Sequence, residues 1–341
     1  MRCILLHRVR ENGPVQHFEK EIIEMKKILA LTMAVAMSLS LAACGGNGGS
    51  ASSNKGGASS GTPSSASGSQ GGDASSAQPS GGADISVYTN AYFAPFEYYD
   101  GTDIAGVDVD VMNMVGEKLG RKVVYTNVEF GTIIDTVSAG KLADVGAAGI
   151  TITDSRKELV DFSDPYFTSV QYVIYPAGSM TPDGTDGDVS YILWDSLAGK
   201  KIGVQADTTG DIYVDMEINA ADGDDYDLGR DGVLLNSGAE ETRYDSAQLA
   251  ADAVGAGQVD VVVVDYLPAS YIVEKNSGFE CAALYYAAGV DGAEAPSPTE
   301  EQYAICVTKG QDELLAAING VLADLGEDGI NDLVMKHMGL E

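Results

Sequence analysis

Histidine is scarce in this sequence, whose 341 residues include only His7, His17 and His337. So few imidazoles argue against a histidine-rich metal site and against a histidine-based catalytic triad. Basic residues are also scarce, because 20 lysines and arginines stand against 51 aspartates and glutamates, which gives a net charge of −31. Nucleic-acid binders build their affinity mostly on basic contacts with phosphate, so the composition excludes a nucleic-acid partner. We predict no metal and no cofactor.

Only one apolar run approaches membrane-spanning length, and it lies near the N-terminus. It follows Lys26-Lys27 and ends at Leu41-Ala42-Ala43, directly before Cys44. A basic start, an apolar centre and small residues before a cleavage point are typical of a secretory signal peptide, and the run is short for a transmembrane helix. We therefore predict a signal peptide at residues 25–43 and regard residues 1–24 as a doubtful upstream extension. The alternative is a short core helix that happens to end at a cysteine.

The position of Cys44 adds a resemblance to this prediction. The segment resembles a bacterial lipoprotein signal, in which the cysteine after Leu-Ala-Ala becomes the lipid-modified N-terminus. Residues 45–83 consist almost entirely of glycine, serine and alanine, a composition that buries too little apolar surface to fold. We predict that residues 44–83 form a lipid-anchored tether, which would hold a folded body at the outer face of the bacterial cell membrane.

The remaining chain alternates between strand-like and helix-like patterns. We predict strands at 85–88, 123–128, 144–149, 201–204 and 259–264, and helices at 108–119, 133–137, 247–254, 314–325 and 330–338. Strands that alternate with helices indicate an α/β fold with mainly parallel sheets. No internal repeat is visible.

Two clusters of polar and aromatic residues follow predicted strands, where open α/β sheets bind ligands. The first is the loop Phe93-Ala94-Pro95-Phe96-Glu97, whose aromatic rings could equally well plug the loop onto the core. The second runs from Gly149 to Arg156. Thr153 or Asp154 suits a helix N-cap, which places Arg156 in the first turn, where it could receive a carboxylate. A surface salt bridge is the alternative for Arg156.

These clusters form part of a longer resemblance. Together with residues 106–110, 161–166, 203–210 and 259–265, they resemble, in order and spacing, the extracytoplasmic solute-binding proteins of polar amino-acid ABC importers. The resemblance implies the two-lobed type 2 periplasmic-binding fold, with 84–168 plus 303–341 as lobe 1 and 169–302 as lobe 2. It implies a hinge of two chain crossings, near 168–172 and 297–303. It also implies a non-enzymatic protein whose partners are a free amino acid, an ABC permease and its ATPase.

The resemblance assigns the polar part of an amino-acid ligand to residues of both predicted lobes. In the family, an arginine holds the ligand α-carboxylate, and this role falls on Arg156 with Thr151 beside it. Thr208 and Thr209 would add to that site from the second lobe, unless Thr208 only caps a helix. The ammonium group would meet Asp265 and the backbone carbonyl of Gly149, unless Asp265 only caps the next turn. Such a ligand contacts both lobes only when the cleft is shut, so binding favours closure.

The resemblance also indicates which residues face the ligand side chain. Phe93 and Phe130 correspond to family positions that stack on it. Asn90 stands where basic-amino-acid and glutamine binders often carry an aspartate, which favours a neutral polar ligand over a cationic one. Asp207 occupies a position where the family commonly has glycine, so the sequence does not decide whether the turn before Thr208 is altered.

Other features keep alternatives open. Residues 222–227 faintly resemble a calcium loop, but a solvated acidic loop explains them better. Cys281 and Cys306 could form a disulfide or remain buried thiols. A rival function is a dehydratase-like enzyme of the same fold that acts on a prephenate-like acid, with Glu97 or Asp265 as general acid. A weaker alternative is an adhesin or sensor module that uses the same ligand.

Overall fold

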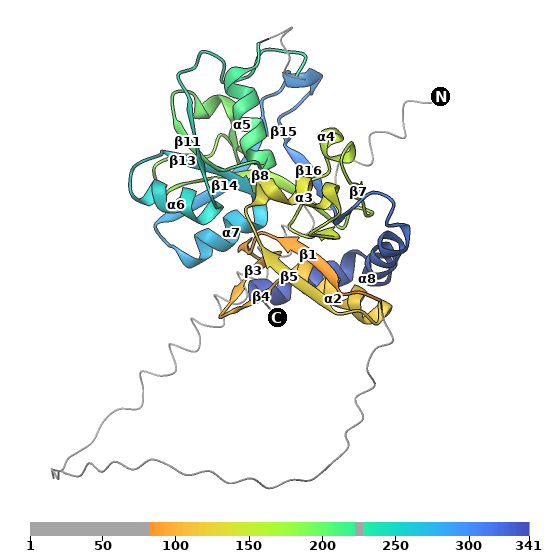
Figure 1. Cartoon of the computed structure of the whole chain (residues 1–341). Coiled ribbons are helices and arrows are strands. Elements are labelled where there is room, and N and C mark those ends of the chain that lie inside the picture. Colours follow the sequence, from red (N-terminus) through yellow and green to blue (C-terminus); the bar gives the residue numbers. More distant parts are fainter. Residues whose placement is uncertain (1–81, 222–227, 341) are drawn as a thin grey trace, which may run out of the picture.

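The computed structural model describes residues 82–221 and 228–340 (Figure 1). The predicted signal peptide, Cys44, nearly all of the predicted tether and the acidic loop 222–227 lie outside the described residues.

The first sheet carries the earliest predicted strands. Its order is β5 (Val123–Asn127), β1 (Ile85–Thr89), β6 (Val145–Gly146), β17 (Cys306–Val307) and β7 (Asp161–Phe162), with β1 parallel to both of its neighbours. Helices α2 (Val107–Leu119), α3 (Ile133–Ala139), α4 (Asp154–Lys157) and α8 (Asp312–Met338) accompany this sheet, together with the 3₁₀ turn η2 (Phe130–Thr132). A small antiparallel sheet adds β2 (Tyr92–Phe93), β3 (Glu97–Asp100) and β4 (Asp103–Ala105). We call the part built on these two sheets lobe 1.

The second large sheet is mixed. Its path runs β12 (Glu240–Tyr244), β11 (Lys201–Gln205), β13 (Val261–Asp265), β8 (Phe167–Pro176), β14 (Phe279–Tyr286), β10 (Val189–Leu193) and β9 (Gly184–Asp186). Strand β15 (Ser297–Pro298) pairs with β14, and β16 (Glu300–Tyr303) pairs with β8. Its helices are α5 (Thr209–Asn219), α6 (Ala247–Gly255) and α7 (Tyr266–Lys275), with short turns η3 (Trp194–Leu197) and η4 (Val290–Gly292). We call this part lobe 2.

Strands β8 and β16 run between the two lobes (Figure 1). They pair antiparallel, with Ser169 opposite Glu301 and Phe167 opposite Tyr303. The predicted hinge segment 168–172 falls on β8, and the segment 297–303 covers β15 and β16. The exact lobe boundaries, 84–168 plus 303–341 and 169–302, stay a prediction.

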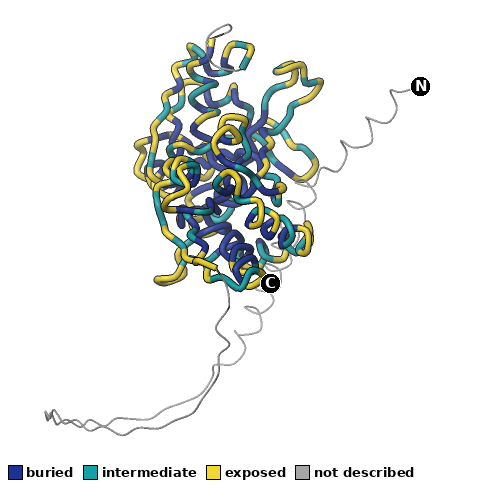
Figure 2. The backbone as a smooth tube through the Cα atoms, turned by 45° about the vertical axis from the view of Figure 1, so that its right-hand side comes forward, coloured by how far each residue is buried: buried dark blue, intermediate teal, exposed yellow. Residues whose placement is uncertain are grey.

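Buried positions line the interior of both lobes (Figure 2). In α2, the predicted spacing puts Val111 and Val115 in the core with no exposed surface, and Gly120 ends the helix in the left-handed conformation. Two predictions need correction at their ends. The strand expected over 144–149 is paired only at Val145–Gly146, since Gly149 has a φ of 55° and turns the chain. The two predicted C-terminal helices form α8, which breaks its helical geometry at Gly326.

Candidate functional site

A small cavity lies between the lobes, where strands of both large sheets end. Asn90 follows β1, whereas Gln205 and Asp265 are the last residues of β11 and β13. The complete lining is Asn90, Phe93, Phe130, Gly149, Thr151, Gln205, Thr208, Thr209 and Asp265. Its volume is about 10 Å³, roughly the space of one water molecule. The structure thus brings together every predicted ligand-binding residue except Arg156, which lies just behind this lining, and adds Gln205.

Aromatic rings form the lobe 1 wall of this cavity. Phe93 stacks against Phe96 with ring centroids 6.1 Å apart. Gly149 is needed beside it for two reasons, because its φ is 55° and because a Cβ there would lie 2.8 Å from the Phe93 ring. The Gly149 N–H donates to Asp108 Oδ2 at 2.9 Å, which fixes the turn. The predicted loop therefore serves both as core and as cavity wall.

Arg156 is held behind the cavity by both lobes. Thr153 caps α4 by accepting a hydrogen bond from the Arg156 N–H, as one of the predicted N-caps requires. Arg156 Nη1 donates to the Thr151 carbonyl at 2.8 Å, and Nη2 donates across the cleft to the Asp207 carbonyl at 3.1 Å. The guanidinium carbon lies 5.5 Å from the centre of the Phe130 ring. Because both acceptors are neutral carbonyls, the positive charge of Arg156 is hydrogen bonded but not neutralised by them.

The lobe 2 wall begins with the turn before α5. Asp207 has a φ of 64°, so it adopts the left-handed conformation that glycine would adopt at this position. Its N–H donates to Asp211 Oδ2 at 2.7 Å, which stabilises the turn. Thr208 caps α5 by accepting from the Asp211 N–H at 3.4 Å, and it also lines the cavity. The capping role and the cavity position of Thr208 therefore coexist, and the turn is preserved despite the aspartate.

Asp265 supplies a buried carboxyl from lobe 2. Only 3% of its surface is exposed, and Tyr303 Oη donates to its Oδ1 at 2.5 Å. Asp265 precedes α7, but its side chain makes no capping hydrogen bond, so the capping alternative is wrong. Burial raises the pKa of Asp265, and the hydrogen bond from Tyr303 opposes that rise.

A pair of neutral amides closes one part of the cavity. Gln205 Nε2 donates across the cleft to Asn90 Oδ1 at 3.0 Å, and Asn90 Nδ2 donates to the Val128 carbonyl at 2.7 Å. Gln205 Oε1 accepts from the Ala247 N–H at 3.2 Å. Sequence reasoning missed Gln205, although it is a polar residue directly after the apolar stretch Ile202–Val204, as Asp265 is after its own apolar strand.

Glu301 is a second residue that sequence reasoning missed. It lies on β16 and is only 3% exposed. Thr151 Oγ1 and Thr209 Oγ1 donate to its Oε2 at 2.6 Å and 2.5 Å. Gln171 Nε2 donates to its Oε1 at 2.7 Å. One carboxyl group thus joins lobe 1, lobe 2 and the hinge strand β8.

Glu97, the other nominated general acid, does not line the cavity. It has no exposed surface, and neither carboxyl oxygen has a hydrogen-bond partner among the described residues. Burial, followed by the charges of Asp108 and Asp265, raises the pKa of Glu97 well above its ordinary value. The group is therefore a buried core carboxyl whose neutral form is favoured, not a side chain placed to touch a substrate.

Neither cysteine of the described chain forms a disulfide. Cys306 is fully buried on β17 of lobe 1, and Cys281 is half-buried on β14 of lobe 2. The disulfide alternative is therefore wrong, and the two residues belong to different sheets. Within residues 82–221 and 228–340, no cluster of histidine, cysteine, aspartate and glutamate could hold a metal ion. Over the same residues, no helix is long and apolar enough to cross a membrane.

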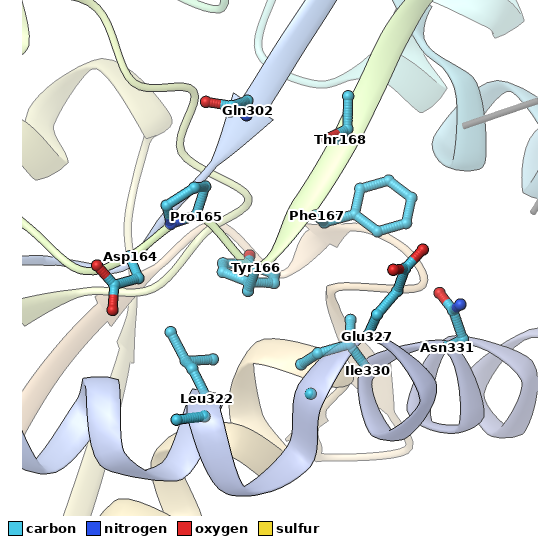
Figure 3. A pocket seen from close by; sticks show the side chains of 12 residues that line it. Asp164, Pro165, Tyr166, Phe167, Thr168, Gln302, Leu322, Glu327, Ile330 and Asn331 are labelled. Atoms are coloured by element: carbon cyan, nitrogen blue, oxygen red, sulfur yellow. The ribbon is translucent and has the colours of Figure 1, made fainter. Parts of the chain in front are cut away.

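A larger pocket of about 340 Å³ lies on lobe 1, away from the predicted site. Figure 3 shows Leu322, Ile330 and Asn331 of α8 facing the segment that leads into β8. Its full lining is Asp164, Pro165, Tyr166, Phe167, Thr168, Gln302, Leu322, Ala323, Gly326, Glu327, Ile330 and Asn331. None of the predicted ligand-binding residues lines this pocket. A pocket of about 500 Å³ is lined by Thr151, Tyr213 and Glu301, among others.

Comparison with known proteins gives a consistent set of relatives. The chain is 30% identical over 313 residues to the probable histidine-binding protein of Neisseria gonorrhoeae. The matched region covers 92% of this chain and 95% of that protein. A solved structure of an ancestral arginine-binding protein bound to arginine matches with a TM-score of 0.57 and 31% identity, over 74% of this chain and 96% of the other. The structure of an ancestral arginine-binding protein bound to glutamine matches with a TM-score of 0.57 and 30% identity, over 76% and 98% of the two chains.

Residues 85–339 match the family of bacterial extracellular solute-binding proteins, family 3. The chain belongs to this family. Its α/β architecture is the type 2 periplasmic-binding fold that the sequence predicted.

Proposed function

We propose that this family 3 solute-binding protein captures a free amino acid between its lobes and delivers it to an ABC permease. The observation that carries the proposal is the placement of Arg156 and Asp265. A carboxyl from lobe 2 lines the cavity and a guanidinium from lobe 1 lies directly behind it, so together they complement the two charges of an α-amino acid. Charge-assisted hydrogen bonds of this kind are stronger than neutral ones.

Arg156 is available for a carboxylate because it is held in place by neutral partners. A ligand carboxylate would replace the Thr151 and Asp207 carbonyls as acceptor of its N–H groups. The hydroxyls of Thr151 and Thr209, whose Oγ1 atoms are 3.3 Å apart, donate to Glu301, so the turn that begins α5 would add its backbone N–H groups as donors. The ammonium group would then face Asp265, with the Gly149 carbonyl as a further acceptor.

Capture requires the lobes to part and close again. A cavity of about 10 Å³ cannot admit an amino acid, so entry needs an open cleft. Contacts that exist only in the closed state supply the differential affinity that makes a ligand favour closure. The closed shape is what the permease would recognise.

The side-chain end of the cavity favours a polar ligand. Phe93 and Phe130 would stack on its apolar part, and the Asn90–Gln205 amide pair would exchange its mutual hydrogen bond for bonds to the ligand. Neutral amides favour a neutral polar side chain. The relatives named above bind histidine, arginine and glutamine, so basic amino acids belong in the same test.

We also propose that Cys44 anchors the protein by a lipid to the outer face of the cell membrane after the signal peptide is removed. The supporting evidence is the sequence around Cys44 and the glycine- and serine-rich composition of residues 45–83. A tether of this length would let the folded body reach the permease.

A thermal-shift screen tests the proposed function directly. The panel contains L-glutamine, L-asparagine, L-arginine, L-histidine and prephenate. We expect at least one amino acid, and not prephenate, to raise the melting temperature, because a ligand that binds only the folded state stabilises it. A shift by prephenate alone would favour the dehydratase-like alternative, and no shift by any amino acid would reject the proposal.

A further inference from the structure

Glu301 occupies a position that no assigned ligand contact explains. It lies on hinge strand β16 and is buried in the closed cleft. Its Oε2 accepts from a threonine of each lobe, Thr151 and Thr209, whose two Oγ1 atoms are 3.3 Å apart. Gln171 on the partner hinge strand donates to Oε1. Opening the cleft has to separate Thr151 from Thr209, so these two bonds cannot both survive it.

The charges around Glu301 disfavour ionisation of its carboxyl group beside Asp265. Asp265 at the end of β13 lies near enough to repel it, and Tyr303 on β16 is bonded to Asp265. The other ionisable groups around Glu301 are Tyr213 on α5, Arg156 on α4, and the exposed Lys157 and Glu300, which line the same pocket as Glu301. Arg156 is the buried cation among them, and the ligand carboxylate would compete for its charge. The closed cleft therefore stabilises a neutral Glu301.

We propose that Glu301 is a proton-dependent clasp, which holds Thr151 and Thr209 together in its neutral form, so that closing the cleft takes up one proton from solvent. In that form Oε2 carries the proton and donates to one threonine Oγ1, which reverses that hydrogen bond, and it still accepts from the other threonine. Parting of the lobes admits water to the carboxyl and returns the proton to solvent.

The electrostatics predict how closure of the cleft depends on pH. Burial first, and then the charge of Asp265, raises the pKa of Glu301 to about 8, while the hydrogen bonds from Thr151, Thr209 and Gln171 oppose the rise. Solvation in an open cleft moves the pKa back toward the ordinary value of about 4.3. The closed form therefore holds more protons, and closure weakens as pH rises toward 8. For one proton, the equilibrium constant for closure falls by at most about tenfold per pH unit.

An NMR titration without and with ligand tests the proton binding. The full chain, labelled with ¹³C at the glutamate carboxyl carbons, is titrated from about pH 3 to about pH 9, alone and with L-glutamine or L-arginine at saturation. We expect one resonance, absent from Glu301→Gln, to titrate near 8 with the ligand that closes the cleft and at lower pH in the free chain. Glu300→Gln is the matched control, because Glu300 is the exposed neighbour on the same strand and its loss should leave that resonance in place. A Glu301 resonance that titrates near 4.3 both in the free chain and with bound ligand overturns the proposal.

A second measurement tests the link to closure and rests on the proposed function. Calorimetric binding of L-glutamine and of L-arginine in two buffers of different ionisation enthalpy gives the protons taken up per bound ligand. Wild type and Glu300→Gln should take up more protons than Glu301→Gln, and equal uptake overturns the clasp. If Glu301→Gln does not fold, Glu301→Asp replaces it, since the shorter acid cannot reach both threonines and should bind both ligands more weakly.

The two proposals fail in different ways. Binding with unchanged proton uptake in Glu301→Gln rejects the clasp and leaves the proposed function intact. Absence of binding by any amino acid, together with a Glu301 resonance near 8, rejects the proposed function and retains the proton-binding role of Glu301 in the closed cleft.

Discussion

Arg156 donates from Nη2 to the backbone carbonyl of Asp207, 3.1 Å away across the cleft. The bond joins an arginine of lobe 1 to the turn that begins α5 in lobe 2. The acceptor is a carbonyl oxygen, so a ligand carboxylate can take its place and gain the full charge of the guanidinium. The same residue thus couples closure of the cleft to recognition of an anion.

Replacing Arg156 by alanine should nearly abolish amino-acid binding. Loss of a buried charge partner costs about 2–5 kcal/mol, or at least thirtyfold in affinity. Isothermal titration calorimetry with the amino acid that gives the largest thermal shift measures the loss. Arg156→Lys is the control, since it keeps the charge without the bidentate geometry. Its ligand affinity should lie between those of the wild type and Arg156→Ala. Unchanged affinity in Arg156→Ala would sink the assignment of the carboxylate site.

Gly131 makes room for Asp207 when the lobes meet. A Cβ at Gly131 would lie 2.1 Å from Asp207 Oδ2, which belongs to the opposite lobe. Gly131→Ala should therefore hinder closure and weaken ligand binding by about 1–3 kcal/mol, the range for overpacking. Its unfolding temperature without ligand should not fall, because η2 favours alanine over glycine by about 0.5–1 kcal/mol.

A second substitution separates this clash from other effects. Asp207→Gly removes the side chain that the methyl group introduced by Gly131→Ala would meet, and it leaves a residue that tolerates the left-handed turn. The double variant should recover most of the lost affinity in calorimetry. Additive losses in the two single variants would show that the contact between these residues does not limit closure.

Asn90 should set the charge preference of the ligand side chain. Asn90→Asp adds a negative charge beside Gln205 and should favour L-arginine over L-glutamine by about fivefold to tenfold, since hydrogen bonds to charged groups are about 1 kcal/mol stronger. Competition binding with both ligands gives the ratio. Asn127→Asp is the matched control, because Asn127 accepts from the Ala91 N–H and does not line the cavity. An equal change in both variants would contradict a direct role for Asn90.

The fold was predictable because its signals are local. Alternating periodicities indicated the α/β architecture, the end of α2 falls at Gly120 directly after the predicted helix 108–119, and Thr153, one of the two predicted N-caps, starts α4. The candidate site, including Asp265, was predictable through the family resemblance. The strand at 144–149 was overextended, because the sequence alone did not show that Gly149 turns the chain.

Contacts between distant segments escaped sequence reasoning. Glu301 meets Thr151 across 150 positions of sequence, and Gln205 meets Asn90 across 115. Nothing near Glu301 in the chain shows that two threonines from different lobes converge on it. Burial of such a carboxyl results from the assembled fold, so neither its protonation nor its partners follow from local pattern.

Cys44 lies outside the described residues, and its lipid anchor is testable in cells. Cys44→Ser should release the protein from the membrane fraction, because the serine cannot carry the lipid. Immunoblots of membrane and soluble fractions measure the distribution. Cys281→Ser is the control, since Cys281 is a free thiol in lobe 2 and its loss should leave the distribution unchanged. Membrane retention with persistent lipid labelling in Cys44→Ser would refute the anchor.

Glu97 should make the folded state less stable as pH rises. Its pKa is raised well above the ordinary value, so the folded chain keeps a proton that the unfolded chain loses above about 4.3. The unfolding free energy should then fall with pH by up to about 1.4 kcal/mol per unit for this one proton. Asp108 and Glu301 act in the same direction, since their pKa values are raised to about 6 and about 8.

The isosteric variant Glu97→Gln isolates this contribution. It removes the titrating proton while leaving the shape of the side chain, so its unfolding free energy should decline less steeply between about pH 5 and about pH 8. Urea denaturation at several pH values gives both slopes. Glu313→Gln, an exposed substitution on α8, should keep the wild-type slope. Identical slopes in wild type and Glu97→Gln would mean that Glu97 titrates alike in the folded and unfolded chains, which its complete burial argues against.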